Sequence, residues 1–78
     1  MPTAFVLIAA EAGSEVEVLR DLRQVEGVEE AFAVSGVYDI VVRVKAGTVD
    51  QLKEIVAGRI RKLNNVRATL TMFVEEKG

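Results

Sequence analysis

The chain has 78 residues and a formal charge of −2, from ten basic and twelve acidic side chains, and it contains no Cys, His or Trp. At this length we expect one compact domain over residues 1–78, and the absence of a basic excess is atypical of a module that binds DNA or RNA directly. Without Cys or His there is no thiolate or imidazole metal site, no disulfide and no Ser-His-Asp triad, so we expect no metal, no cofactor and no catalytic residues.

The first predicted element is a strand over Thr3 to Ala10, which is rich in β-forming residues and apolar on both alternating faces. This pattern is typical of a strand that is covered on both sides. The run is far shorter than the roughly 20 residues that cross a bilayer, and no basic stretch precedes it as in a secretory signal. We therefore expect a cytoplasmic protein without a membrane partner.

A helix is predicted next, because Ser14 stands three residues before Glu17 in a capping-box arrangement. Its apolar positions lie on one face at helical spacing, and Gly27 follows its end near Val25. The segment Val28 to Val34 then alternates imperfectly and predicts a second strand, with one face formed by Val28, Phe32 and Val34.

The turn Ser35-Gly36 separates this strand from a third, predicted over Tyr38 to Lys45. We expect its inward face to carry Ile40, Val42 and Val44, and its other face Val41, Arg43 and Lys45. A second helix is predicted from the N-cap Thr48, with Gln51 three residues later, to Asn64-Asn65.

The last strand, Val66 to Val74, alternates between two sets of side chains. One set is Val66, Ala68, Leu70, Met72 and Val74, and the other is Arg67, Thr69, Thr71 and Phe73. Four basic residues cluster near the end of the second helix, where cations complement the helix dipole. A phosphate-binding patch is the alternative interpretation of these residues, which are Arg59, Arg61, Lys62 and Arg67.

Two βαβ halves follow one another, and the tripeptides Ala12-Gly13-Ser14 and Ala46-Gly47-Thr48 precede their helices. Right-handed crossovers predict an α+β fold of the ferredoxin-like βαββαβ type, a four-stranded antiparallel sheet with two helices on one face. The other face also carries apolar residues, such as Val41 and Phe73. A soluble monomer rarely exposes such a face, so we expect a homodimer in which two sheets pack as a dimeric α/β sandwich.

The segment Ser35-Gly36-Val37-Tyr38-Asp39 is the candidate binding site. Gly36 permits a positive φ, so the backbone can present amide N–H groups to an anion, and Asp39 supplies a carboxylate for a cation. Together these groups suit a free α-amino acid. The alternative is that Gly36 and Asp39 are ordinary turn residues and that Tyr38 packs against the core.

The chain resembles the effector-binding domain of the Lrp/AsnC family of feast/famine regulators, which is called the RAM domain. The resemblance lies in the order of elements, in the Gly-x-Tyr-Asp turn at Gly36 to Asp39 and in the Val-Arg-x-Thr-x-Thr run at Val66 to Thr71. The resemblance spans Thr3 to Val74. Since the first predicted strand begins at Thr3, the chain is similar to a stand-alone RAM domain without the helix-turn-helix of the transcription factors.

The resemblance implies roles for individual residues at an effector site between dimers. Gly36 and Val37, next to Ser35, would offer amides to the ligand carboxylate, Asp39 would accept from its ammonium group, and Tyr38 would form a wall. The hydroxyls of Thr69 and Thr71 match family positions near the site. The alternative is that both threonines are present because Thr is a good strand former.

We expect a regulatory module that senses a free amino acid and forms homodimers and ring-like oligomers. Its output would pass to full-length Lrp/AsnC regulators or to a metabolic enzyme. The alternatives are a small dimeric α+β-barrel enzyme and a purely structural oligomerisation module.

Overall fold

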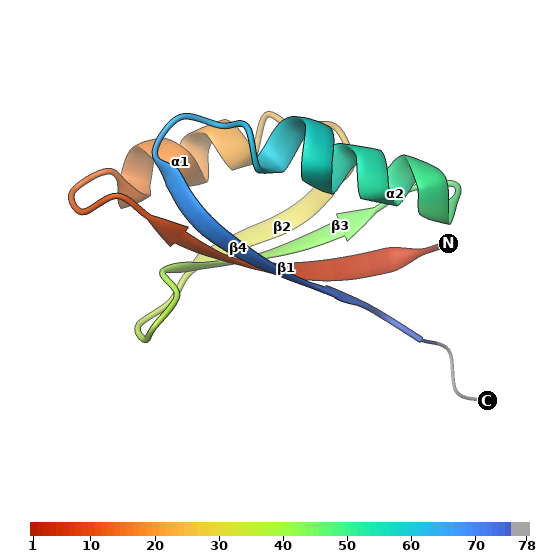
Figure 1. The fold of residues 1–78 in the computed structure, drawn as a ribbon, viewed down its shortest axis with the longest axis horizontal. Coiled ribbons are helices and arrows are strands. Elements are labelled where there is room, and N and C mark those ends of the chain that lie inside the picture. Colours follow the sequence, from red (N-terminus) through yellow and green to blue (C-terminus); the bar gives the residue numbers. More distant parts are fainter. Residues whose placement is uncertain (76–78) are drawn as a thin grey trace.

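The elements of the chain follow the predicted βαββαβ order in the computed structural model, which describes residues 1–75. They are β1 (Thr3–Ala10), α1 (Glu15–Leu22), β2 (Val28–Ala33), β3 (Ile40–Lys45), α2 (Val49–Ile55), the π-helical turn η1 (Val56–Ile60) and β4 (Val66–Phe73). The four strands form one antiparallel sheet in the order β2-β3-β1-β4, with both helices on one face (Figure 1). The predicted ferredoxin-like α+β fold is confirmed.

The hydrophobic core lies between the helices and one face of the sheet. Residues from both central strands, α1 and η1 are fully shielded from solvent there, namely Ala4, Val6, Ile8, Val18, Leu22, Ile40, Val42, Val44 and Ile60. The predicted inward face of β3 is therefore confirmed. Burying each Val, Leu or Ile side chain contributes roughly 1.5–3 kcal/mol, so each of these residues stabilises the fold.

The other face of the sheet carries no helix, and an apolar row crosses it from edge to edge. Directly opposed residues of antiparallel strands share a face, and the pairing register aligns one apolar residue from each strand. We call this row the open-face stripe: Phe32, Val41, Leu7 and Leu70. Beside it, Met72 and Phe5 continue the apolar surface on β4 and β1, whereas Arg43 and Glu30 form an ion pair of 2.8 Å on β3 and β2.

The predicted placement of Phe73 on the open face is wrong. Phe73 is paired with Ala4, so it lies on the helix-bearing side, while Leu70 and Met72 lie on the open side. A register shift between Ala9 and Ala10 also brings Val66 to the core side. Because β1 is apolar on both faces, the sequence pattern could not determine which side of β4 faces the helices.

The two predicted capping boxes have different outcomes. Thr48 Oγ1 accepts a hydrogen bond from the Gln51 N–H (3.1 Å), which confirms the N-cap of α2. Ser14 makes no such bond, and its hydroxyl instead donates to the Glu11 carbonyl (2.6 Å). The partner expected for Ser14, Glu17, accepts from Asn65 Nδ2 (2.8 Å).

Both predicted helices are shorter than expected. α1 ends at Leu22 instead of Val25, and α2 passes into the π-helical turn η1 after Ile55. In β2, an irregularity between Val28 and Glu30 turns Val28 toward the core. The prediction that Val28 and Phe32 share a face is therefore wrong. Among residues 1–75, no helix combines the length and the apolar composition that crossing a membrane requires.

The connection from α1 to β2 depends on a glycine. Gly27 has a φ of 100°, and a Cβ added there would lie 2.7 Å from Ile55 Cδ1 and 3.0 Å from the Lys45 carbonyl oxygen. We expect Gly27→Ala to lower the free energy of unfolding by about 1–3 kcal/mol, because both the backbone conformation and the close approach exclude a side chain. Urea unfolding followed by circular dichroism measures this change.

Gly58, in η1, provides a matched control for that substitution. A Cβ there would meet only Glu54 Cγ at 3.8 Å, an ordinary contact, and the backbone is not left-handed. Gly58→Ala is therefore expected to leave stability unchanged or to raise it by up to about 1 kcal/mol through helix propensity. Equal losses for both alanine variants, at equal protein concentration, would contradict the account of Gly27.

Candidate functional site

The hairpin between β2 and β3 is held to the end of β1 by Asp39. The Asp39 N–H donates to the Ile8 carbonyl (2.8 Å), and Asp39 Oδ2 accepts from the Ala10 N–H (2.8 Å). The Val34 N–H donates to the Asp39 carbonyl (2.8 Å) and closes the base of the hairpin. Three hydrogen bonds therefore fix Asp39, although regular strand structure starts only at Ile40.

The tip of the hairpin extends into solvent on the side of the sheet that faces away from the helices (Figure 1). Ser35, Gly36 and Val37 are exposed, Val37 to 89%, while Tyr38 and Asp39 are half-buried. Gly36 has a positive φ of 158°, which residues with a side chain rarely adopt, but this value is far from the left-handed turn of an anion-binding nest. Within residues 1–75 the amides of Gly36 and Val37 donate no hydrogen bond, so they are free to bind an external acceptor.

Thr69 and Thr71 lie elsewhere on the chain. They are paired with Ile8 and Val6 on the helix-bearing side of β4. Here they line a groove of about 390 Å³ between β4 and the α2–η1 helix, together with Lys53 and Arg61. The hairpin does not line this groove, so a single chain does not bring all the predicted site residues together.

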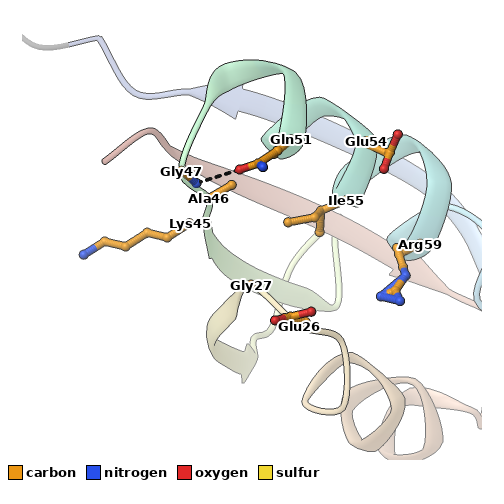
Figure 2. Close-up of a pocket in the computed structure, with 9 residues that line it drawn as sticks. All are labelled: Glu26, Gly27, Lys45, Ala46, Gly47, Gln51, Glu54, Ile55 and Arg59. Carbon is orange, nitrogen blue, oxygen red and sulfur yellow. Dashed lines mark hydrogen bonds between the residues drawn. The ribbon is translucent and has the colours of Figure 1, made fainter.

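The predicted basic cluster is divided between two surfaces. Arg61 and Arg67 line a depression beside Thr69 at the start of β4. Arg59, two residues before Arg61, faces the opposite way, into a cleft between α2–η1 and the α1–β2 connection (Figure 2). Side chains two residues apart on a helix point to different faces. The prediction of a single basic cluster overlooked this separation of Arg59 from Arg61.

Sequence reasoning missed this second cleft, which has a volume of about 550 Å³. Its lining comes from three separate segments: Glu26, Gly27, Lys45, Ala46, Gly47, Gln51, Glu54, Ile55 and Arg59. No local motif links residues so far apart along the chain. The available signal was Gly27, whose need for a left-handed conformation marks a close approach of the backbone to another element.

Comparison with known proteins gives one family and a consistent set of relatives. The family model described as the Lrp/AsnC ligand binding domain matches residues 3–77. An uncharacterized HTH-type transcriptional regulator of Pyrococcus furiosus is 34% identical over 73 residues, which cover 90% of this chain and 49% of the regulator. The chain thus spans about half the length of the curated regulators that it matches.

An enzyme also contains a similar segment. The homocitrate synthase of Saccharolobus islandicus is 39% identical over 74 residues, which cover 91% of this chain but only 16% of the enzyme. The similarity is therefore to one part of that enzyme.

Solved structures have the same fold and a related sequence. The crystal structure of FFRP-DM1 has a TM-score of 0.92 and 37% identity, and covers 96% of this chain and 100% of its own. A feast or famine regulatory protein from M. tuberculosis, complexed with L-methionine, has a TM-score of 0.79 and 27% identity, covering 99% of this chain and 52% of its own.

Proposed function

The chain belongs to the Lrp/AsnC ligand-binding domain family, and from this premise we propose that it is a non-enzymatic regulatory module that binds a free amino acid where copies of the chain meet. The observation that carries the proposal is the hairpin, in which the amides of Gly36 and Val37 donate no hydrogen bond to any of the described residues and Asp39 holds a carboxylate in a fixed place. A related regulator is complexed with L-methionine, which supports an amino acid as the ligand class.

Each hairpin residue has a chemical role in this proposal. The amides of Gly36 and Val37 bind the ligand carboxylate, with the Ser35 hydroxyl nearby, and the half-buried Tyr38 forms a wall. Asp39 uses Oδ2 for Ala10, so its other oxygen, Oδ1, is the acceptor for the ammonium group. Thr69 and Thr71 line a different groove of the same chain, so in this proposal they contribute from a neighbouring copy.

Pairing of the open faces supplies the dimer. The open-face stripe is an apolar surface of the kind that soluble monomers cover, and two such sheets pack face to face at about 10 Å. Since the hairpin extends on the same side as the stripe, dimer formation brings it close to a second chain (Figure 1). Further association of dimers into rings completes the site.

Ligand binding and assembly are then linked. A ligand that binds only the assembled form stabilises it by RT ln(1 + [L]/Kd), about 2.7 kcal/mol when the ligand is at 100 times its Kd. Amino-acid concentration would thereby set the degree of assembly.

Sedimentation velocity of the protein with each of the twenty standard amino acids tests the proposal. We expect at least one amino acid, at millimolar concentration, to shift the distribution between dimer and larger species. An unchanged distribution with all twenty would argue against ligand-linked assembly and leave the alternative of a structural oligomerisation module.

The target of the regulation has two candidates. Full-length Lrp/AsnC regulators carry the same domain and are natural partners for co-assembly, as the matched HTH-type regulators suggest. The similar segment in homocitrate synthase favours a metabolic enzyme as the second candidate, since a ligand-binding domain attached to an enzyme is suited to control it. This match does not support the hypothesis that the chain itself is an enzyme, because it covers only 16% of homocitrate synthase.

A further inference from the structure

The cleft in Figure 2 is remote from the hairpin. It lies beyond Lys45, the last residue of β3, whereas the hairpin precedes Ile40, the first residue of that strand. Six strand residues span on the order of 20 Å. The cleft also borders the helix layer, while the hairpin extends from the other side of the sheet. A ligand of the hairpin therefore cannot occupy the cleft.

The walls of the cleft are held in place by the backbone. The Lys45 N–H donates to the Gly27 carbonyl (2.8 Å), and the absence of a Cβ at Gly27 allows the α1–β2 connection to pack against Ile55. On the other wall, the Gly47 N–H donates to Gln51 Oε1 (3.1 Å) and closes the first turn of α2. These contacts form the cleft before any ligand binds, and its volume of about 550 Å³ is within the range of small-molecule sites.

Two opposite charges face the cleft without a partner. Arg59 extends from η1 toward the connection that carries Glu26, and the half-buried Ile55 lines the same cleft above them, toward Gly27 (Figure 2). Within residues 1–75 neither Arg59 nor Glu26 forms an ion pair. The side chains of Lys45 and Glu54, also at the cleft, point away from the space between Arg59 and Glu26.

We propose that this cleft is a second small-molecule site, and that its ligand is a zwitterion with a carboxylate, an ammonium group and an apolar portion. Arg59 binds the carboxylate, Glu26 binds the ammonium group, and Ile55 contacts the apolar portion. A ligand with only a negative charge would be repelled by Glu26, and one with only a positive charge by Arg59. A free amino acid has the required chemistry. This second site is independent of whether the hairpin binds a ligand.

Titration calorimetry with each of the twenty standard amino acids tests this site. We expect Arg59→Gln and Glu26→Gln each to weaken the binding of at least one amino acid by about ten- to a hundredfold, since each removes a charge-assisted contact. The matched controls Arg20→Gln and Glu29→Gln remove the same charges at exposed positions outside the cleft and should leave binding unchanged.

Modified ligands test the same point on the unmutated chain. For each amino acid that binds, the N-acetyl derivative lacks the ammonium group and the methyl ester lacks the carboxylate. Both should bind at least tenfold more weakly than the parent. Equal binding of either derivative would overturn the zwitterion assignment.

Comparison with Asp39→Asn separates the two sites. Binding that is lost in the cleft variants but kept in Asp39→Asn supports the cleft and counts against the hairpin. Binding that is lost in Asp39→Asn but kept in both cleft variants overturns the cleft. The absence of heat for all twenty amino acids would overturn it as well.

Discussion

Replacing Leu70 with glutamate is expected to dissociate the proposed dimer, with a rise of at least a hundredfold in its dissociation constant. Leu70 is the β4 member of the open-face stripe and is 46% exposed in the single chain. A carboxylate at this position would be buried without a partner when two sheets pack, at a cost of several kcal/mol per chain. About 2.7 kcal/mol already corresponds to a hundredfold change. Sedimentation equilibrium across a range of protein concentrations measures the shift.

Val16 provides the matched control for this substitution. It is 74% exposed on α1, on the helix layer and not on the open face. Val16→Glu introduces the same charge in place of a similar apolar residue and should leave the dissociation constant within about threefold of the unmutated value. If Leu70→Glu remains as tightly associated as the parent, the open face is not the interface. If only the Val16→Glu variant dissociates, the interface lies on the helix layer.

The alternation of apolar and polar residues along a strand predicts which side chains share a face, but it does not always predict which face is turned toward the helices. In β3 the apolar residues Val42 and Val44 alternate with Arg43, and burial follows the pattern directly. In β4 the more polar Thr69 and Thr71 lie on the helix-bearing side. This placement is tolerated because β4 is an edge strand, and the helix layer leaves an open groove over it instead of a closed core. The sequence gives no information on how far a helix layer extends.

The capping motifs show a similar limit. Ser14 and Thr48 stand in the same pattern, but a side-chain cap requires the backbone to be extended at the cap residue. Thr48 is extended, with φ −135° and ψ 162°, whereas Ser14 has φ −109° and ψ 10°. The turn before α1 therefore directs the Ser14 hydroxyl back to Glu11. Residue identity alone could not distinguish the two helix starts.

The sequence predicted which residues form the candidate site, but not how they are arranged in space. The turn from Ser35 to Asp39 was identified from its residue types, and the structure places it in an exposed hairpin. The bond from Ala10 to Asp39 joins residues 29 positions apart, and no short motif indicates it. Glu26 and Arg59 line the same cleft only because the α1–β2 connection and η1 pack on the same side of the sheet. Contacts of this kind follow from the tertiary fold.

The double role of Asp39 determines how its function can be tested. Asp39→Ala is expected to lower the free energy of unfolding by about 1–3 kcal/mol, because the Ala10 N–H loses its acceptor. Ala10 is only 4% exposed, so water cannot readily replace the carboxylate. Loss of ligand response in Asp39→Ala would therefore be ambiguous between a binding role and a damaged hairpin.

Asp39→Asn separates the two roles, because its side-chain oxygen can still accept from Ala10 while the charge is removed. We expect its stability in urea to stay within about 1 kcal/mol of the parent, and its affinity for the amino acid that drives assembly to fall at least tenfold. The reason is that the amide NH₂ replaces the oxygen proposed to face the ammonium group, and two donors repel each other. Calorimetry and sedimentation measure binding and assembly on the same sample. A stable Asp39→Asn variant with full affinity would mean that Asp39 serves only to hold the hairpin against β1.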